Sequence, residues 1–410
     1  MSDAEPARVR RAAREDSPSR RAASANSHVT EVHVEGFRTA RKLSFSPRSL
    51  CALVGEARSG KSNLLAAIRA ALDPASAPLR AADAAADGDG QVSIRVRLAD
   101  GGRVTLEGTP GGHTIDRPPS VPPVLFLSAA ARATTQLVEG TPIGAEAARA
   151  LEIFRRALGP VEAIDLCCAA EVKGLLLLVE EPELYLRPQA QRYLYRLLRE
   201  FVASGNQVIY STHSPAFLNV ARLEELVFIE RLPSTGTRAL HPEPVGADEE
   251  FRVMSEFDAA RSELFLARAV VLVEGLTEKL VLPFVFSALG HDIDRDAISV
   301  VECGGKPNIP LFARICKAAG IPFVVVHDSD RRSSGKLAPG DLALNALIAD
   351  TAGEGRVVVL DPDFEAVAGL DAHSHKPEHA WREFAERPPA EMPEQLVRVA
   401  ELAVSLARQQ

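Results

Sequence analysis

The sequence predicts an α/β protein with two successive domains, each built on a mainly parallel β-sheet. The chain has 410 residues, which is more than one ordinary domain holds. Strand-sized apolar runs alternate with helical segments in both halves, as is typical of parallel sheets covered by helices. Several of these runs end in glycine or carboxylate residues, and parallel α/β sheets carry their sites at such strand ends.

The composition is that of a soluble globular protein. Charged residues make up 25% of the chain and hydrophobic residues 46%, which excludes collagen-like, mucin-like and wholly disordered proteins. The net charge is −8, so any nucleic-acid binding must use a local patch. The sequence shows neither an apolar run of about 20 residues nor the apolar core of a signal peptide. We therefore expect a cytoplasmic protein that does not engage a membrane.

The N-terminal half predicts a tail followed by one α/β domain. Residues 1–28 are rich in Arg, Ala and Ser without a hydrophobic period, which indicates a disordered, basic and polar tail. The domain is expected over residues 29–245, and residues 232–250 look like a linker because they are rich in Pro, Gly and acids. Its strands are predicted at 29–37, 50–54, 91–98, 103–107, 124–127, 175–179 and 207–210, and its helices after Lys61, across most of 145–173, and at 188–203.

The C-terminal half repeats a β-α-β-α-β rhythm within a domain expected over residues 262–378. Its strands are predicted at 269–273, 298–302 and 322–326, its helices at 277–289 and 309–319, and a further strand at 356–360. Residues 379–410 are expected to form a helical segment, because the apolar residues of 394–408 recur on one helix face.

A phosphate-binding loop follows the second predicted strand. Residues 55–62 read GEARSGKS, which fits G-x-x-x-x-G-K-[ST] between a strand and a helix. The glycines let backbone N–H groups turn toward a phosphate, and the helix N-terminus adds partial positive charge. We expect Lys61 to reach the terminal phosphates and Ser62 to hold Mg²⁺. The sequence thus predicts ATP as a ligand, bound by Gly55, Ser59, Gly60, Lys61, Ser62 and Asn63.

Two more strands of this domain end in chemistry-bearing residues. After residues 175–179, Glu180 is predicted to complete the nucleotide site by orienting the water shell of its metal, and Glu181 to polarise the attacking water. After residues 207–210, His213 is expected to contact the γ-phosphate. The segments EEPELYLRP (180–188) and STHS (211–214) resemble an ABC-type ATPase head of the SMC/RecF-like group and, within it, the OLD (overcoming lysogenization defect) family. The resemblance implies that Glu181 is the catalytic glutamate and His213 the switch histidine.

One motif of ABC heads is altered. At the place of the LSGG-like signature the chain reads LGPVEA (158–163), which lacks the second glycine and the serine. The sequence therefore predicts ATP binding and leaves fast hydrolysis open. Because ABC heads pair to complete their sites, the resemblance implies a homodimer or a higher homo-oligomer.

Carboxylates gather at the strand ends of the second domain. The strand 269–273 delivers Glu274 at its tip, and Glu278 lies one helical turn further on. The next but one strand leads into Asp328 and Asp330. Such carboxylates repel and raise one another's pKa, which a divalent cation relieves. Oxygen-only ligands favour Mg²⁺ or Mn²⁺ over zinc.

The motifs EGLTE (274–278), GGK (304–306) and DSD (328–330) together resemble a Toprim domain over roughly residues 268–331. The resemblance implies metal-dependent phosphoryl chemistry on nucleic acids, and GGK is expected to approach a phosphate backbone. An ABC head followed by a Toprim domain is the arrangement of OLD-family nucleases and of the Gabija anti-phage nuclease subunit. That family has a further acid and a lysine, which points to Glu365 and Lys376. By resemblance the catalytic residues are Glu274, Asp328, Asp330 and Lys376, and the metal ligands are Glu274, Glu278, Asp328, Asp330 and Glu365.

The two sites together predict an ATP-binding, divalent-metal-dependent DNA endonuclease, gated by ATP, in anti-phage defence or DNA processing. The expected partners are DNA, further copies of the chain and a helicase. Two alternatives stay open: a non-nucleolytic ATP switch whose Toprim domain only binds, and a primase- or topoisomerase-like enzyme. All four tyrosines lie in the ATPase half, which disfavours the last.

Overall fold

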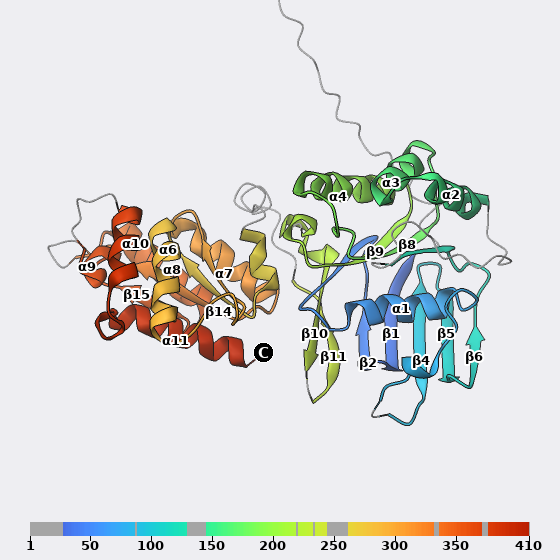
Figure 1. Cartoon of the computed structure of the whole chain (residues 1–410), viewed down its shortest axis with the longest axis horizontal. Helices are drawn as coiled ribbons and strands as arrows, with labels where there is room; N and C mark the ends of the chain where they lie inside the picture. The colour runs from blue at the N-terminus through green and yellow to red at the C-terminus, as the bar shows by residue number, and fades with distance from the viewer. Residues whose placement is uncertain are drawn as a thin grey trace, which may run out of the picture.

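The computed structural model describes residues 28–86, 88–128, 145–218, 220–232, 234–243, 261–331, 336–370 and 376–409. Of the predicted tail 1–28, only His28 lies within the described residues, and the side chain of Lys376 lies outside them. The described elements form two α/β lobes that lie side by side along the long axis of the molecule (Figure 1).

The first lobe encloses helix α1 between two sheets. One is antiparallel, with the strand order β2-β1-β4-β5-β6, and the other is mainly parallel, with the order β11-β10-β3-β9-β8-β7. The strands are β1 (Val29–Phe37), β2 (Ala40–Phe45), β3 (Leu50–Val54), β4 (Val92–Leu98), β5 (Arg103–Thr109), β6 (Gly112–Asp116), β7 (Val124–Leu127), β8 (Leu176–Glu180), β9 (Gln207–Thr212), β10 (Leu226–Leu232) and β11 (Gly236–Leu240). The helices are α1 (Lys61–Leu72), α2 (Ala145–Arg156), α3 (Pro160–Ala169) and α4 (Pro188–Ala203).

Strand β3 is apolar on both faces because each face meets a separate core. Cys51 and Leu53 pack into the core that contains α1, whereas Ala52 and Val54 pack into the core beneath α3 and α4. Side chains of a strand alternate between its faces, so a continuous apolar run is what a doubly covered strand requires. This core position fixes the phosphate loop that follows β3.

The predicted linker 232–250 begins with a β-hairpin. Strands β10 and β11 pair antiparallel, with Phe228 opposite Leu240, and β10 also runs parallel to β3. The linker prediction for residues 236–240 was therefore wrong. The sequence GTRAL carries little hydrophobic signal, and its strand conformation comes from pairing with β10. Residues 244–250 of this predicted linker lie outside the described part of the chain.

The second lobe is a parallel sheet with the strand order β13-β12-β14-β15. Its strands are β12 (Ala269–Val273), β13 (Ile298–Glu302), β14 (Phe323–Asp328) and β15 (Val357–Leu360), and its helices are α6 (Leu276–Ala288), α7 (Ile309–Ala318), α8 (Pro339–Ala352), α9 (Phe364–Ala368), α10 (Lys376–Glu386) and α11 (Glu394–Arg408). Helices α7 and α8 share a core with one sheet face, and α6, α10 and α11 with the other. The C-terminal helices thus pack directly on the sheet that carries the carboxylates.

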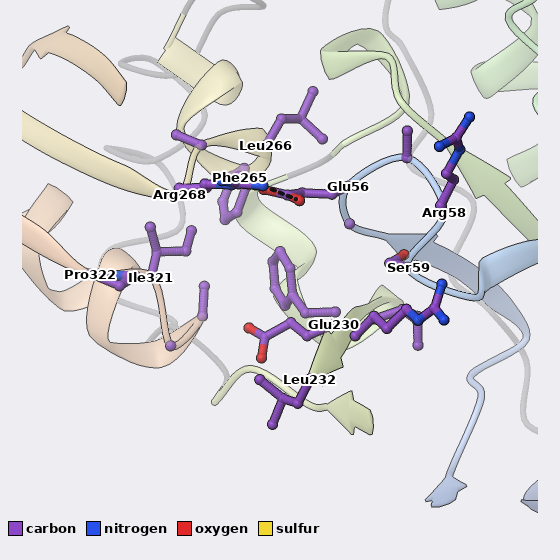
Figure 2. Close-up of a pocket in the computed structure, with 18 residues that line it drawn as sticks. Glu56, Arg58, Ser59, Glu230, Leu232, Phe265, Leu266, Arg268, Ile321 and Pro322 are labelled. Carbon is purple, nitrogen blue, oxygen red and sulfur yellow. Dashed lines mark hydrogen bonds and ion pairs between the residues drawn. The ribbon is translucent and has the colours of Figure 1, made fainter. Parts of the chain in front are cut away.

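The two lobes meet through a shared apolar core and polar contacts. The ring of Phe228 on β10 stacks on that of Phe265 in the 3₁₀ helix η7 (Arg261–Leu266), with 5.8 Å between centroids. The amide of Glu243 donates to the carbonyl of Ala318 at 3.2 Å. A cavity of about 250 Å³ lies between the phosphate loop and the start of β12 (Figure 2). Among the described residues, no helix has the length and apolar character needed to cross a bilayer.

Candidate nucleotide and carboxylate sites

The phosphate loop joins β3 to α1 and requires its two glycines. Gly55 has φ +151°, and a Cβ there would lie 2.1 Å from the carbonyl oxygen of Ile229. Gly60 has φ +115°, and a Cβ there would lie 2.6 Å from Oγ1 of Thr237. Both values lie in the region that favours glycine. The β10–β11 hairpin therefore packs tightly against the loop and holds its shape.

Lys61 is buried within this loop, and only 5% of it is exposed. Its Nζ donates to the carbonyls of Gly55 at 2.8 Å and Glu56 at 2.7 Å. Burial lowers the pKa of Lys61 to about 8, although nearby carboxylates oppose the shift. The buried hydroxyl of Ser59 has no hydrogen-bond partner among the described residues. A cationic donor and an unused hydroxyl at a helix N-terminus fit a nucleotide phosphate.

The remaining predicted binding residues of the loop differ in their surroundings. Ser62 is exposed in the first turn of α1. The Asn63 amide donates to Oγ1 of Thr39 at 2.7 Å and accepts from Arg38 at 3.2 Å, so this side chain braces the β1–β2 turn.

The ends of β8 and β9 lie beside the phosphate loop. In the sheet register Val54 is opposite Thr212, and Ser211 is opposite Glu180. Nε2 of His213 lies 3.7 Å from Oε1 of Glu181. Burial, and then the positive charge of Lys61, lowers the pKa of His213. The structure therefore brings Glu180, Glu181 and His213 to the edge where a terminal phosphate would lie.

The structure adds Glu183, to which the sequence reading assigned no role. It is only 8% exposed, and its Oε1 accepts a hydrogen bond from the backbone amide of His213 at 2.6 Å. Burial raises the pKa of Glu183. Glu183 thus ties the acidic loop after β8 to the histidine loop after β9. The third acid of EEPE was the available signal, but it does not reveal a partner 30 residues away.

We expect Glu183→Ala to destabilise the protein by about 1–3 kcal/mol, because it leaves the partly buried amide of His213 unpaired. Glu183→Gln keeps an acceptor oxygen and should cost less than about 1 kcal/mol. Chemical denaturation of the two variants measures this difference. Equal losses would show that the carboxylate does not anchor the histidine loop.

The second site lies at the carboxyl ends of β12 and β14, which are neighbours in the sheet. Oε1 of Glu274 accepts a hydrogen bond from the backbone amide of Asp328 at 2.7 Å. Glu278 follows in the first turn of α6 and is 5% exposed. Glu365 lies in the short helix α9 and raises the pKa of both Glu278 and Asp328 through its charge. Four of the predicted metal ligands therefore lie in one region. They come from the β12–α6 segment, the end of β14 and helix α9.

Burial and mutual repulsion make these carboxylates hard to ionise. Burial raises the pKa of Asp328 to about 8, with contributions from the charges of Glu274 and Glu278. Burial likewise raises the pKa of Glu278 to about 7 and that of Glu274 above its ordinary value. Oδ1 of Asp328 is buried without a hydrogen-bond partner among the described residues. This cluster has the character of a divalent-cation site.

The carboxylates of this cluster do not surround a common point as the ligands of a bound metal ion do. In the described part of the chain, no three His, Cys, Asp or Glu side chains are placed so that they could hold a metal ion together. Glu274, Glu278, Asp328 and Glu365 are the residues that would hold Mg²⁺ or Mn²⁺ there. Such an ion supplies charge neutralisation and an activated water.

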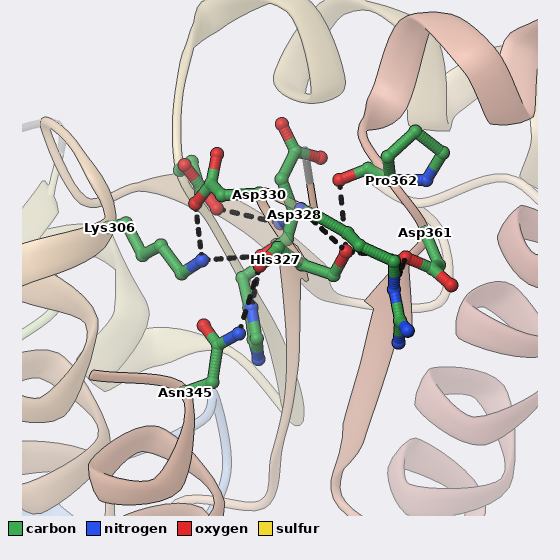
Figure 3. Close-up of polar contacts among 10 residues, drawn as sticks. Lys306, His327, Asp328, Asp330, Asn345, Asp361 and Pro362 are labelled. Carbon is green, nitrogen blue, oxygen red and sulfur yellow. Dashed lines mark hydrogen bonds and ion pairs between the residues drawn. The ribbon is translucent and has the colours of Figure 1, made fainter. Parts of the chain in front are cut away.

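Asp330 is engaged by a buried lysine that the site prediction omitted. Nζ of Lys306 donates to Oδ2 of Asp330 at 2.6 Å and to the carbonyl of Asp328 at 2.5 Å (Figure 3). Lys306 belongs to the GGK motif, which the sequence reading assigned to a phosphate backbone. Lys376, the predicted catalytic lysine, begins α10, but its side chain lies outside the described residues. The structure therefore places Lys306 at the carboxylates and leaves the role of Lys376 a prediction.

The loop after β14 is held by its neighbours in a fixed shape. Asp330 has φ +60°, and its amide donates to the carbonyl of Pro362 at 3.0 Å. The hydroxyl of Ser329 donates to Asp361 at 2.6 Å, and Asn345 donates to the carbonyl of Ser329 at 3.0 Å. This network, visible in Figure 3, sets the direction in which Asp328 and Asp330 leave the strand.

Fold and sites together define a P-loop ATPase domain of the ABC type followed by a Toprim domain. Matches to family models agree with that assignment. Residues 265–330 match the Toprim domain of proteins like the overcoming lysogenization defect protein, and residues 162–218 match an AAA ATPase domain. Residues 27–81 match a family described as a protein of unknown function.

Relatives of this chain confirm its resemblance to the OLD family. It is 39% identical to the OLD nuclease of Thermus scotoductus over 220 residues, which are 49% of this chain and 42% of the relative. It is 31% identical to the Old nuclease of Escherichia phage P2, over 38% of this chain and 28% of that protein. It is 23% identical to the Endonuclease GajA of Bacillus cereus, over 38% and 26% respectively. The match spans less than half the length of each of these relatives.

Proposed function

We propose that this protein is an ATP-binding, divalent-metal-dependent DNA endonuclease, in which the Toprim site hydrolyses a phosphodiester and the ATPase domain gates it. The observation that carries the proposal is the Asp328 carboxylate, whose buried Oδ1 has no partner among the described residues and on which the charges of four other carboxylates act. A buried cluster of this kind is costly without a cation. Metal-activated water beside such a cluster is suited to phosphodiester hydrolysis. The names of the similar nucleases support the same activity.

Purified protein should nick and linearise supercoiled plasmid in Mg²⁺ or Mn²⁺. The variant Asp328→Ala/Asp330→Ala should lose at least about 100-fold of this activity, because removal of preorganised charge stabilisation commonly costs that much. Gel electrophoresis of plasmid with and without ATP measures both effects. Cleavage that persists unchanged in the double variant would refute the proposal.

A non-nucleolytic ATP switch is the second candidate. It is favoured by the Lys306–Asp330 pair, because a lysine that neutralises a carboxylate removes part of the demand for a cation. Under this alternative the protein binds nucleotide but cleaves no plasmid in any divalent metal. Cleavage that disappears in the double variant decides against it.

The partners follow from the proposed activity. We propose DNA as the substrate and a homodimer as the working form, with a helicase as a further partner and anti-phage defence or DNA processing as the setting. The dimer is supported by exposed apolar side chains near the two segments that pair in ABC heads: Leu158, at the signature position, is 96% exposed, and Tyr185, after the acidic strand, is 89% exposed. Light scattering with and without ATP tests the dimer.

A further inference from the structure

The phosphate loop touches the Toprim domain through one bidentate ion pair. Both carboxylate oxygens of Glu56 accept hydrogen bonds from the guanidinium of Arg268, which lies immediately before β12; the Nη2–Oε2 distance is 3.0 Å. In Figure 2 the two side chains point at each other across the cavity between the lobes. This ion pair is drawn between the loop and the second lobe in that view. A bidentate Arg–carboxylate pair of this kind fixes the relative orientation of the two side chains as well as the distance between them.

Glu56 is also tied to the lysine that would bind phosphate. Its backbone carbonyl accepts a hydrogen bond from Nζ of Lys61 at 2.7 Å. A nucleotide phosphate competes for that ammonium, so its arrival removes a donor from the carbonyls of Gly55 and Glu56. The segment that holds the Glu56 side chain therefore changes its bonding when the nucleotide site fills.

Arg268 is joined to the carboxylate site by strand β12. Its backbone amide donates to the carbonyl of Ala297 at 2.8 Å, which fixes it to the start of β13. Strand β12 then runs from Ala269 to Val273, buried throughout, and delivers Glu274. Because β12 lies between β13 and β14, a shift of this strand moves Glu274 relative to Asp328. A buried strand transmits such a shift because packed interiors deform little.

The rest of the interface leaves room for this motion. The stacked rings of Phe228 and Phe265 keep the lobes in apolar contact beside the pair. The cavity of about 250 Å³ lies between the loop and the starts of β12 and β14, so the loop can move without first expelling packed side chains.

We propose that the Glu56–Arg268 pair transmits nucleotide occupancy of the phosphate loop to β12, and so makes the carboxylate site respond to ATP. The inference rests on the proposed function for its biological meaning, but the coupling itself is a physical link between two binding sites. By linkage, ATP and the Toprim cation then alter each other's binding. Since both side chains are about half exposed, the pair supports a modest coupling of about two- to fivefold.

Hydrogen–deuterium exchange of the full chain tests this link without DNA. Wild-type protein in Mg²⁺, with and without saturating ATP, should show a two- to fivefold change in exchange for peptides covering residues 268–275. Arg268→Gln should abolish that response while it still binds ATP. The swapped pair Glu56→Arg/Arg268→Glu should restore it. The matched control is Arg295→Gln, which removes an exposed ion pair with Asp296 in the same domain and should leave the response intact.

A full response in Arg268→Gln, or a wild-type protein that binds ATP with no change at residues 268–275, would overturn the inference. Plasmid cleavage by the same proteins in Mg²⁺ alone separates this result from the proposed function. If none of these proteins cleaves plasmid, the proposed nuclease activity is refuted. The exchange experiment then still decides whether ATP binding is coupled to β12.

Discussion

Asp328→Asn should raise the melting temperature of the metal-free protein at pH 8 while it abolishes plasmid cleavage. An unfolded carboxyl ionises near pH 4, whereas folded Glu278 and Asp328 have pKa values of about 7 and about 8. The folded state therefore binds more protons than the unfolded state in this window, and stability falls as the pH rises through it. At pH 8 the penalty amounts to several kcal/mol, on the order of 1.4 kcal/mol per pKa unit. A neutral amide at position 328 relieves most of it.

Thermal melts from pH 5 to pH 8.5 in EDTA measure this effect. Wild-type protein should be most stable near the acidic end of the range, and Asp328→Asn should be less sensitive to pH. The gain at pH 8 should be about 2–4 °C per kcal/mol. The exposed Asp350 on α8 supplies the control, because Asp350→Asn should change neither the melting temperature nor cleavage. A destabilised Asp328→Asn at pH 8 would mean that this carboxylate has a structural role and no unmet need for a cation.

Lys61→Ala should weaken nucleotide binding by at least about 100-fold and leave the metal affinity of the Toprim site unchanged. The substitution removes the buried ammonium that the loop points at a phosphate, a charge-assisted donor that neutral groups do not replace. The variant should fold. Burial disfavours the charged form of Lys61, so removing this ammonium costs the folded protein little stability.

Fluorescence titration with a labelled ATP analogue measures the first effect, and a Mn²⁺ titration in the absence of nucleotide measures the second. Lys279→Ala, in the first turn of α6 in the second lobe, is the matched control and should retain nucleotide affinity. Normal ATP affinity in Lys61→Ala would overturn the assignment of the phosphate loop.

The sequence predicted the elements whose chemistry is local. The apolar runs that became β3, β8, β9, β12 and β14 each ended in the residues that mark a site, because a buried parallel strand and its terminal loop are encoded by adjacent positions. The glycines of residues 55–62 carry their own backbone requirement. Those predictions depended on neighbours in the chain.

What escaped prediction depends on distant partners. The pairing of β11 with β10, the contact of Glu183 with His213, and the Glu56–Arg268 pair join residues that no local pattern links. Lys306 was visible as part of GGK, but only the fold places its ammonium between Asp328 and Asp330. The sequence predicted Lys376 as the lysine near the carboxylates. Tertiary packing places Lys306, which follows β13, beside them.

The proposed nuclease requires above all a divalent cation held by the carboxylates at the ends of β12 and β14. Isothermal titration of Mn²⁺ into Lys61→Ala, which lacks a working nucleotide site, tests this directly. We predict at least one bound ion per chain in that variant and its loss when Asp328→Asn is added. Equal Mn²⁺ binding with and without Asp328→Asn, or no binding to either protein, would contradict the claim.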